Sequence, residues 1–535
     1  MGDQRTMGRS MPDVLLYDTT LRDGAAREGL SFSPEDKIRI LRHLDSFGMH
    51  YVEGGYPASN PKDQEFFDAA TKLELKNTRL VAFGSTRRAL TSASRDKEMK
   101  ALASCGAKTA CIVGKSWDFH VKKALKIALD ENLFMIEESV KYLKKKGLEL
   151  LFDAVHFFDG YKDNPKYALQ TLEAAASGGV DWTVLCDTNG GSLPHEVASI
   201  VREVNEKIGV PIGIHAHNDC ECAVANTLEA VREGARMVHG TMNGYGERCG
   251  NANLCSVIPD LALKMNIDCI SRERLTGLTE LSHYVSELAN LSPDSHQPFV
   301  GTSAFAHKGG LHASGVSKET RTYEHIRPEL VGNIQRIVVS ELSGKSTITM
   351  KAAEMGIDLQ HKPETLAEIL KEIKQLEHVG FQFEAADGSF EILVRKALDM
   401  YKASFKLESF RVIMEKREDG KVMTEATVKI HVGDRRVVAT GEGNGPVNAL
   451  DRAIRIAMER SFPALEDIEL TDYKVRVLDE KKGTAAVTRV LIESSDGEKD
   501  WGTIGVNENI IEASWQALVD SIDYGLLHKR QQPHE

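Results

Sequence analysis

The chain has 535 residues, of which 41% are hydrophobic, so it can fill two or three separate cores. Its formal net charge is −12, with acidic and basic residues interleaved, which argues against a nucleic-acid partner. The first dozen residues hold no signal-peptide core and no later stretch is apolar enough to cross a bilayer, so we expect a cytoplasmic protein with no membrane partner.

Eight short apolar runs follow one another through the first half of the chain, and each ends in polar or glycine-rich residues. They cover residues 14–20, 51–57, 79–85, 110–116, 148–154, 182–188, 211–217 and 237–243. The segments between them have helical spacing; two of them, 33–48 and 164–179, begin with Ser-Pro or Asn-Pro and end in Gly. The alternation predicts an α/β fold, a TIM (β/α)8 barrel, in which catalytic groups lie at the carboxyl ends of the strands.

The alternative to the barrel is a doubly wound open sheet. That fold would place a Gly-x-Gly-x-x-Gly loop after the first strand. Here the loop at residues 19–29 reads "TTLRDGAAREG", which lacks that pattern, so the sequence favours the barrel.

The periodicity weakens after the eighth run. We assign residues 12–290 to the barrel and 291–395 to helical linker subdomains that contribute to the active site, with helices at 346–356 and 362–378. Residues 396–535 contain two similar units, each reading as three alternating strands followed by an amphipathic helix. We predict that these two βββα repeats share one core and form an α+β regulatory or dimerisation domain, because no catalytic groups cluster there.

The seventh run ends in two histidines, His215 and His217. Residues i and i+2 of a strand face the same side, so both imidazoles point together. Two core histidines would look the same, but Asp23 at the end of the first strand offers a third ligand. A site of two imidazoles and one carboxylate suits Mn²⁺, Mg²⁺, Zn²⁺ or Co²⁺ and leaves positions open to substrate oxygens.

Other polar residues follow the same strand ends. Arg22 neighbours Asp23 and is placed to donate to developing negative charge rather than only to a surface ion pair. Glu53, at the end of the second strand, would be costly to bury alone, and we predict that Arg22 is its partner. After the eighth strand the loop "NGYGERCGNANL" contains Asn251, whose side-chain oxygen is a candidate fourth metal ligand.

Ten ordered motifs carry a resemblance to a known family. They are "DTTLRDG", "EGGYP", "CDTNGG", "HAHND", "NGYGERCGNANL", "FAHKGGLHASGV", "YEHIRPELVGN", "SELSGKS", "GNGPVNALDRA" and "WGTIGVNENIIEASWQALVDSIDYGLL". From about residue 13 to 527 the chain resembles the citramalate synthase group of the DRE-TIM metallolyases, relatives of 2-isopropylmalate and homocitrate synthases. The resemblance implies an acyltransferase that condenses acetyl-CoA with a 2-oxo acid, most simply pyruvate to citramalate, and then hydrolyses the thioester to release CoA.

The resemblance also assigns roles to residues of the barrel. The positions that match the divalent-metal ligands are Asp23, His215, His217 and Asn251. Arg22 matches the arginine that polarises the keto oxygen, and Glu53 matches the glutamate of the same signature. Thr188 matches the threonine that receives the carboxylate of the 2-oxo acid.

Further roles fall outside the barrel. His312 and Tyr323 match an acid–base pair that the linker supplies, often from the neighbouring subunit, and His307 is an accessory to it. The C-terminal repeats resemble a domain that binds an end-product amino acid, isoleucine in citramalate synthases. The linker of this family reaches across a two-fold axis, so we expect a homodimer.

Two positions depart from the family pattern. Ala26 stands where a glutamine is usual, and Val155 stands where a glutamate is usual. Both should border the 2-oxo acid pocket, which would then be roomier and less negative. Pyruvate is therefore the first expectation, and 2-oxobutyrate, 2-oxoisovalerate or the anionic phosphonopyruvate, with Arg27 nearby, are alternatives.

Two other classes of function stay open at this point. A metal-dependent lyase would break the same kind of carbon–carbon bond, as 3-hydroxy-3-methylglutaryl-CoA lyase does, but that enzyme lacks the C-terminal repeats. A non-catalytic amino-acid sensor would explain Ala26 and Val155, although the retained Arg22, Asp23 and His215 argue against it. An assay for free CoA thiol separates a synthase from a sensor.

Overall fold

The computed structural model describes residues 12–59, 61–340, 343–478, 483 and 486–529. The chain divides into two compact units. The first comprises the described residues up to Phe305 together with Ile326–Ile334, and the second comprises Ala306–His325 and the described residues from Gln335 onward. Among the described residues, no helix combines the length and apolar character that a membrane crossing requires.

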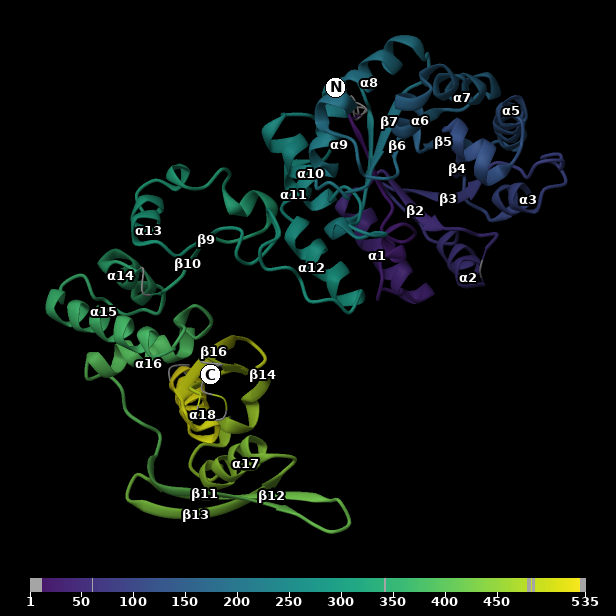
Figure 1. Ribbon diagram of the computed structural model, residues 1–535. Coiled ribbons are helices and arrows are strands. Elements are labelled where there is room, and N and C mark those ends of the chain that lie inside the picture. The colour runs from purple at the N-terminus through teal and green to yellow at the C-terminus, as the bar shows by residue number, and fades with distance from the viewer. Residues whose placement is uncertain (1–11, 60, 341–342, 479–482, 484–485, 530–535) are drawn as a thin grey trace, which may run out of the picture. The chain divides into compact units, whose positions relative to one another are not determined.

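The first unit is built on a closed barrel of parallel strands in the order β1 to β8, which confirms the predicted TIM barrel (Figure 1). Their bounds are β1 Leu15–Asp18, β2 Tyr51–Gly55, β3 Arg79–Ser85, β4 Thr109–Lys115, β5 Glu149–Val155, β6 Trp182–Asp187, β7 Ile212–Ala216 and β8 Met237–Gly240. Each strand lies within or beside one of the eight predicted apolar runs.

Helices surround the barrel. The longer ones are α1 Pro34–Phe47, α2 Pro61–Ala70, α3 Lys97–Ser104, α5 Leu129–Lys145, α7 Pro165–Gly178, α8 Pro194–Lys207, α9 Ala223–Arg232 and α12 Leu278–Leu288. The shorter ones are α4 Asp118–His120, α6 Phe157–Asp163, α10 Leu254–Pro259 and α11 Arg272–Leu275. Helix α1 begins with a capping box between Ser33 and Asp36 and ends at Gly48 with a left-handed φ of 101°, as its sequence predicts.

Strand residues alternate between two apolar cores. Inward-facing side chains such as Tyr17, Cys111 and Leu151 fill the barrel interior, and outward-facing ones such as Ile214 pack beneath the helices. Because both faces of the sheet are covered, the strands read as nearly continuous apolar runs, and a polar residue among them stands out.

The second unit begins with a small helical part. Strands β9 Ala306–His307 and β10 Arg336–Ile337 pair in parallel, and the helices are α13 Gly310–Val316, α14 Lys345–Glu354, α15 Pro363–His378 and α16 Asp387–Ala397. Helices α14 and α15 confirm the two predicted helical stretches. A core of its own joins α14, α15 and α16 through residues such as Ile348, Ile369 and Phe390.

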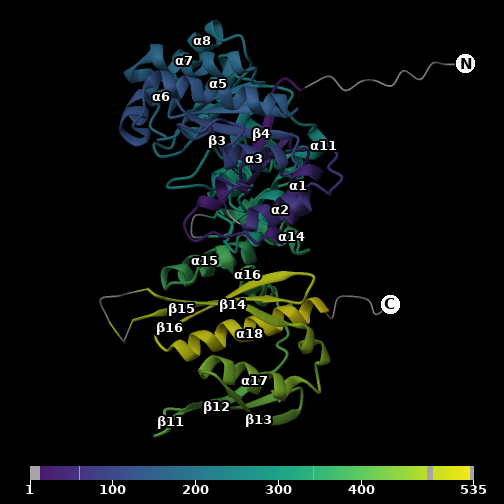
Figure 2. The same ribbon diagram turned by 90° about the vertical axis from the view of Figure 1, so that its right-hand side faces the viewer.

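The remainder of the second unit confirms the predicted pair of βββα repeats. Its elements are β11 Lys406–Lys416, β12 Val422–Val432, β13 Arg435–Gly443, α17 Pro446–Met458, β14 Glu469–Val477, β15 Thr488–Ser495, β16 Asp500–Asn507 and α18 Ile510–Lys529. Each set of strands forms an antiparallel sheet, and α17 and α18 lie between the two sheets (Figure 2). Residues of both repeats, including Ile430, Leu450, Ile492 and Leu518, share one apolar core.

Candidate active site at the carboxyl ends of the barrel strands

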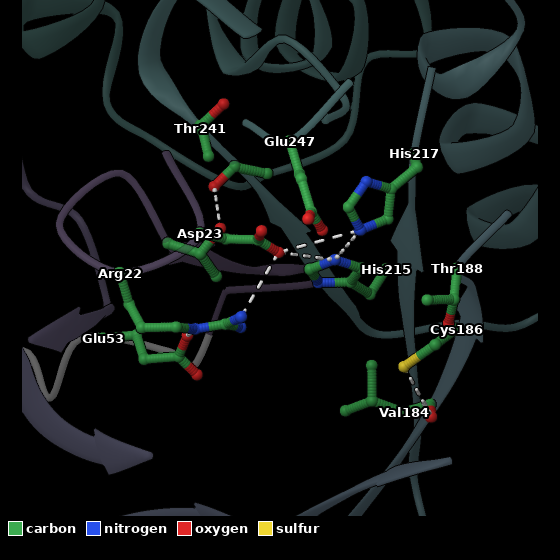
Figure 3. Close-up of polar contacts among 12 residues, drawn as sticks. Arg22, Asp23, Glu53, Val184, Cys186, Thr188, His215, His217, Thr241 and Glu247 are labelled. Carbon is green, nitrogen blue, oxygen red and sulfur yellow. Dashed lines mark hydrogen bonds and ion pairs between the residues drawn. The ribbon is translucent and has the colours of Figure 1, made fainter. Parts of the chain in front are cut away.

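Three buried side chains converge where β1 and β7 end (Figure 3). The Asp23 Oδ2 atom lies 3.2 Å from His215 Nε2 and 3.8 Å from His217 Nε2, and the two Nε2 atoms are 3.3 Å apart. His215 belongs to β7, His217 follows it directly, and Asp23 lies in the turn after β1. The strand alternation that predicted a common direction for the two imidazoles thus brings them to a carboxylate from the first strand, and the set of donors fits a divalent cation.

Asn251 approaches the same place from the loop after β8. Its backbone bridges to that of His217, and its amide is 2% exposed. Within the described residues neither its side-chain oxygen nor its side-chain nitrogen has a hydrogen-bond partner. A buried amide without a partner is costly, and a cation bound by the oxygen would relieve that cost.

The charges around Asp23 favour its ionised form. Burial opposes ionisation, but Arg22 and the two imidazoles together hold the pKa of Asp23 far below its usual range. Burial, with the charge of His215, lowers the pKa of His217 to about 4, so this imidazole is neutral at pH 7. An ionised carboxylate and a neutral imidazole are the forms that ligate metals.

Arg22 and Glu53 form the pair that the sequence predicted. Arg22 Nε donates to Glu53 Oε1 at 2.5 Å, and Tyr17 Oη donates to Glu53 Oε2 at 2.7 Å. The guanidinium also lies 3.5 Å from Asp23 and 3.9 Å from the centre of the Phe83 ring. These contacts hold Arg22 beside the three candidate ligands and leave further N–H groups for a substrate oxygen.

Asp18, in the same motif, faces another way. It is fully buried and accepts hydrogen bonds from the backbone N–H and the hydroxyl of Thr20. Burial raises its pKa to about 7. Asp18 therefore shapes the turn that carries Arg22 and Asp23 rather than joining the ligand set.

Thr188 lies just after β6. Its Oγ1 accepts the backbone N–H of His156 at 2.8 Å, which leaves its own O–H to donate to another acceptor. Its backbone oxygen accepts from Arg248 at 2.6 Å. The residue before it, Asp187, accepts the backbone N–H of His217 at 3.2 Å, so Thr188 follows β6 beside the end of β7 (Figure 3). This placement suits a donor to a substrate carboxylate.

The two positions that depart from the family pattern lie at different points of the barrel mouth. Ala26 is exposed and lines a cavity of about 480 Å³ together with Arg22 and Lys37. Val155 is the last residue of β5 and is half-buried. Arg27 is exposed, with its guanidinium 5.2 Å from the centre of the Tyr245 ring.

The predicted acid–base pair belongs to the second unit. The rings of His312, in α13, and Tyr323 stack with centroids 4.2 Å apart, and both side chains are exposed. His307 is buried, and its Nε2 lies 3.2 Å from Glu324 Oε1. The fold therefore brings His312 to Tyr323, and it gives His307 a separate partner.

Two buried residues of the barrel were missed by the sequence reasoning. They are Asp153 of β5 and His239 of β8. Together with His215 they form a second group of three residues whose possible ligand atoms all lie within 4.8 Å of one another. The His239 ring stacks on Tyr17 at 3.7 Å, and within the described residues neither of its nitrogens has a hydrogen-bond partner. Burial raises the pKa of Asp153 to about 6. The sequence did contain a signal for both residues. Asp153 and His239 are polar residues that interrupt otherwise apolar strands, at positions that face the barrel interior.

Three family models match successive parts of the chain. The HMGL-like model matches residues 13–284, the homocitrate synthase post-HMGL domain-like model matches 299–380, and the LeuA allosteric (dimerisation) domain matches 384–526.

Several related proteins bear the name (R)-citramalate synthase. The one from Geobacter sulfurreducens is 54% identical over 520 residues, which cover 97% of this chain and 98% of the relative. The one from Aquifex aeolicus is 53% identical over 521 residues, covering 97% and 99% of the two chains. The one from Synechocystis sp. is 49% identical over 532 residues, covering 97% of each.

Proposed function

Because the chain belongs to the HMGL-like family and, within it, to the (R)-citramalate synthases, we propose that it condenses acetyl-CoA with pyruvate and water to give citramalate and CoA. The observation that carries this proposal is the 54% identity to one such synthase over nearly the whole of both chains. In this reaction the methyl group of acetyl-CoA loses a proton and its carbon bonds to the keto carbon of pyruvate. The keto oxygen takes up a proton, and water cleaves the thioester to leave a carboxylate and the CoA thiol.

Asp23, His215, His217 and Asn251 would hold a divalent cation. The short distances among the first three support this assignment, and so does the amide of the fourth, which has no hydrogen-bond partner within the described residues. A bound divalent cation supplies Lewis acidity toward the oxygens of the 2-oxo acid. The mixture of imidazole, carboxylate and amide is compatible with Mn²⁺, Mg²⁺, Zn²⁺ or Co²⁺.

Arg22 and Thr188 position the 2-oxo acid in this proposal. Arg22 donates to the keto oxygen, which gains negative charge as the new bond forms, and Glu53 keeps the guanidinium aimed. The free hydroxyl hydrogen of Thr188 donates to the substrate carboxylate. Both interactions act on the substrate through groups that the fold already holds in place.

Proton transfer is assigned to His312 and Tyr323. A methyl group next to a thioester is a very weak acid, so its proton is removed only by a positioned base. Histidine exchanges protons near neutral pH, and the stacked Tyr323 orients its ring. We place this pair over the barrel of the partner subunit in a homodimer, as the resemblance implies.

We further propose that three segments of the chain have different functions. Residues 12–290 carry the metal and the 2-oxo acid, 291–395 contribute the acid–base pair, and 396–535 regulate and dimerise. A cavity of about 690 Å³ between the two repeats is lined by apolar Val447 and Leu470 and by the charged pair of Asp451 and Arg455. Such a lining suits an aliphatic amino acid, and isoleucine is the proposed effector. The cytoplasmic location stays a prediction.

The test is release of CoA thiol from acetyl-CoA in the presence of pyruvate, with the carbon product identified by NMR. We expect citramalate in amounts equal to the CoA released, loss of activity after treatment with a chelator, and recovery on adding a divalent cation. Asp23→Asn should weaken cation binding in calorimetry and lower kcat by about 10³-fold or more. Release of CoA without citramalate, or full activity in Asp23→Asn, would contradict the proposal.

A further inference from the structure

A half-buried lysine lies at the mouth of the barrel. Lys115 is the last residue of β4, two positions after Val113 and four after Cys111, both of which lie in the barrel interior. Strand alternation therefore directs Lys115 to the interior side as well. In the part of the chain that the structure describes, it forms no ion pair, and burial alone lowers the pKa of its ammonium group.

Within the described residues, the groups next to Lys115 are an aliphatic side chain and an imidazole. Its register partner on β5 is Val155, an aliphatic residue. A second neighbour is His120. Burial lowers the pKa of its imidazole most, and the charges of His156 and Lys115 lower it further. The charge of Asp159 acts on His120 in the opposite direction, but this carboxylate lies 3.3 Å from His156 Nδ1 and also accepts from Asn189. A half-buried cation among neutral and cationic groups is unfavourable unless a ligand brings an anion.

This cation borders the place proposed for the 2-oxo acid. Val155 follows Asp153 by two strand residues, a rise of about 7 Å, and Asp153 lies in the group that includes His215. His156, next to Val155, donates its backbone N–H to Thr188, the proposed partner of the substrate carboxylate. Lys115 and Val155 thus lie on the side of the substrate pocket formed by β4, β5 and β6.

We infer that Lys115 is a specificity-determining residue that binds a second negative charge of the substrate, so that the enzyme accepts 2-oxo acids bearing a carboxylate or phosphonate on the carbon next to the keto group. This inference rests on the proposed function, and it extends the substrate class beyond pyruvate. The bonds made and broken are those of the pyruvate reaction, and the second anionic group remains unchanged in the product.

The decisive measurement is the ratio of kcat/KM for a dianionic acid to kcat/KM for pyruvate. Oxaloacetate and phosphonopyruvate are the two dianionic substrates, and CoA release is the readout. Lys115→Met should lower the ratio by at least about 30-fold, because a charge partner is removed from a partly desolvated site. Val155→Glu should lower it as well, since the new carboxylate would occupy Lys115. Lys145→Met, an exposed lysine of α5, is the matched control and should leave the ratio unchanged.

Stability separates a binding role from a structural one. If Lys115 has no partner in the free protein, Lys115→Met should unfold at the same temperature as the natural chain or higher. Val155→Glu should also raise the unfolding temperature, because it completes an ion pair. A lower unfolding temperature in Lys115→Met would show that the lysine holds the fold, and it would overturn the inference.

The KM for acetyl-CoA separates a site for the second anion of the acid from a site for CoA. If Lys115→Met raises only the KM for acetyl-CoA and leaves the acid ratio unchanged, the anion belongs to CoA and the inference is wrong. Calorimetric binding of phosphonopyruvate, without acetyl-CoA, tests Lys115 independently of turnover. Binding that weakens by about 30-fold in Lys115→Met supports the inference even where no CoA is released, whereas absence of CoA release with every acid contradicts the proposed function itself.

Discussion

The guanidinium of Arg22 is held from three sides by Glu53, Asp23 and the face of Phe83. Glu53 is itself fully buried and is satisfied by Arg22 and Tyr17. A planar guanidinium can bond to Glu53 through one nitrogen and still direct others toward a substrate, which a single ammonium cannot do in the same position. At the residue scale, geometry rather than charge alone therefore defines the role of Arg22.

This geometry predicts the effect of a change that keeps the charge. Arg22→Lys should lower kcat by about 10²- to 10³-fold, because the donor to the developing negative charge is displaced. The KM for acetyl-CoA should stay unchanged. Steady-state kinetics measure both, with Arg202→Lys on the surface of α8 as the matched control. A kcat for Arg22→Lys close to that of the control would show that Arg22 acts only as a charge.

At the element scale, the loop after β8 shows how backbone conformation serves the site. Gly250 has a φ of 89°, and a Cβ at this position would press against the carbonyl oxygen of Gly244. The next residue is Asn251, whose backbone bridges to His217. A glycine is therefore required for the loop to bring the Asn251 amide to the three other candidate ligands.

Gly250→Ala should lower the affinity for Mn²⁺ by about 10- to 100-fold, since the loop must shift to relieve the clash. Isothermal titration calorimetry of the metal measures this effect. The matched control is Gly147→Ala, because Gly147 has a similar φ of 82° but, among the residues that the structure describes, no atom within 4 Å of the added Cβ. Equal metal affinity in the two variants would remove Asn251 from the ligand set.

A buried carboxylate with two basic partners links α16 to α18. Glu391 is 1% exposed, accepts from Arg395 at 2.7 Å and lies 3.2 Å from His528. Burial opposes its charge, but the bonds to His528 and Arg395 lower the pKa of Glu391 below its usual value. A lowered pKa means that the pair stabilises the folded state above the ordinary pKa and loses this effect as the pH falls through the folded value.

Glu391→Gln should therefore lower the free energy of unfolding by about 2–4 kcal/mol at neutral pH. The difference from the natural chain should shrink as the pH falls below about 4. Urea denaturation at several pH values measures it, and Glu368→Gln on the exposed face of α15 is the control. A difference that stays constant with pH would mean that packing, not charge, accounts for the loss.

On the scale of the whole molecule, the proposed machinery is divided between two units with separate cores. The candidate metal ligands lie in the first unit, and the stacked pair of His312 and Tyr323 lies in the second. The second unit also carries the part that matches the LeuA allosteric (dimerisation) domain. We therefore expect that an effector bound to the second unit changes the catalytic rate, because that unit carries both the regulatory part and the proposed acid–base pair.

Two measurements test this coupling. In light-scattering chromatography the chain should elute at twice its mass of 59.1 kDa. Isoleucine should lower the apparent affinity of the enzyme for its substrates by about 5- to 150-fold. Asp451→Asn, in the cavity between the repeats, should reduce the isoleucine effect, whereas Glu459→Gln at the exposed end of α17 should not. Inhibition that is identical in both variants would place the effector elsewhere.

Much of the architecture could be read from local patterns. The eight apolar runs, the capped helices and the two βββα repeats are periodic over a few residues, and each formed the element that its period predicts. The direction shared by His215 and His217 also follows from strand alternation, which needs no knowledge of other segments.

The order of the elements and the identity of the residues at strand ends follow from local sequence patterns. Which of those residues meet depends on the folded barrel: Asp23 but not Asp18 reaches the histidines, Asp153 and His239 join His215, and Lys115 lies beside Val155. The reason is that closure of the barrel sets the register between strands, so contacts across it depend on all eight strands at once and not on any local pattern.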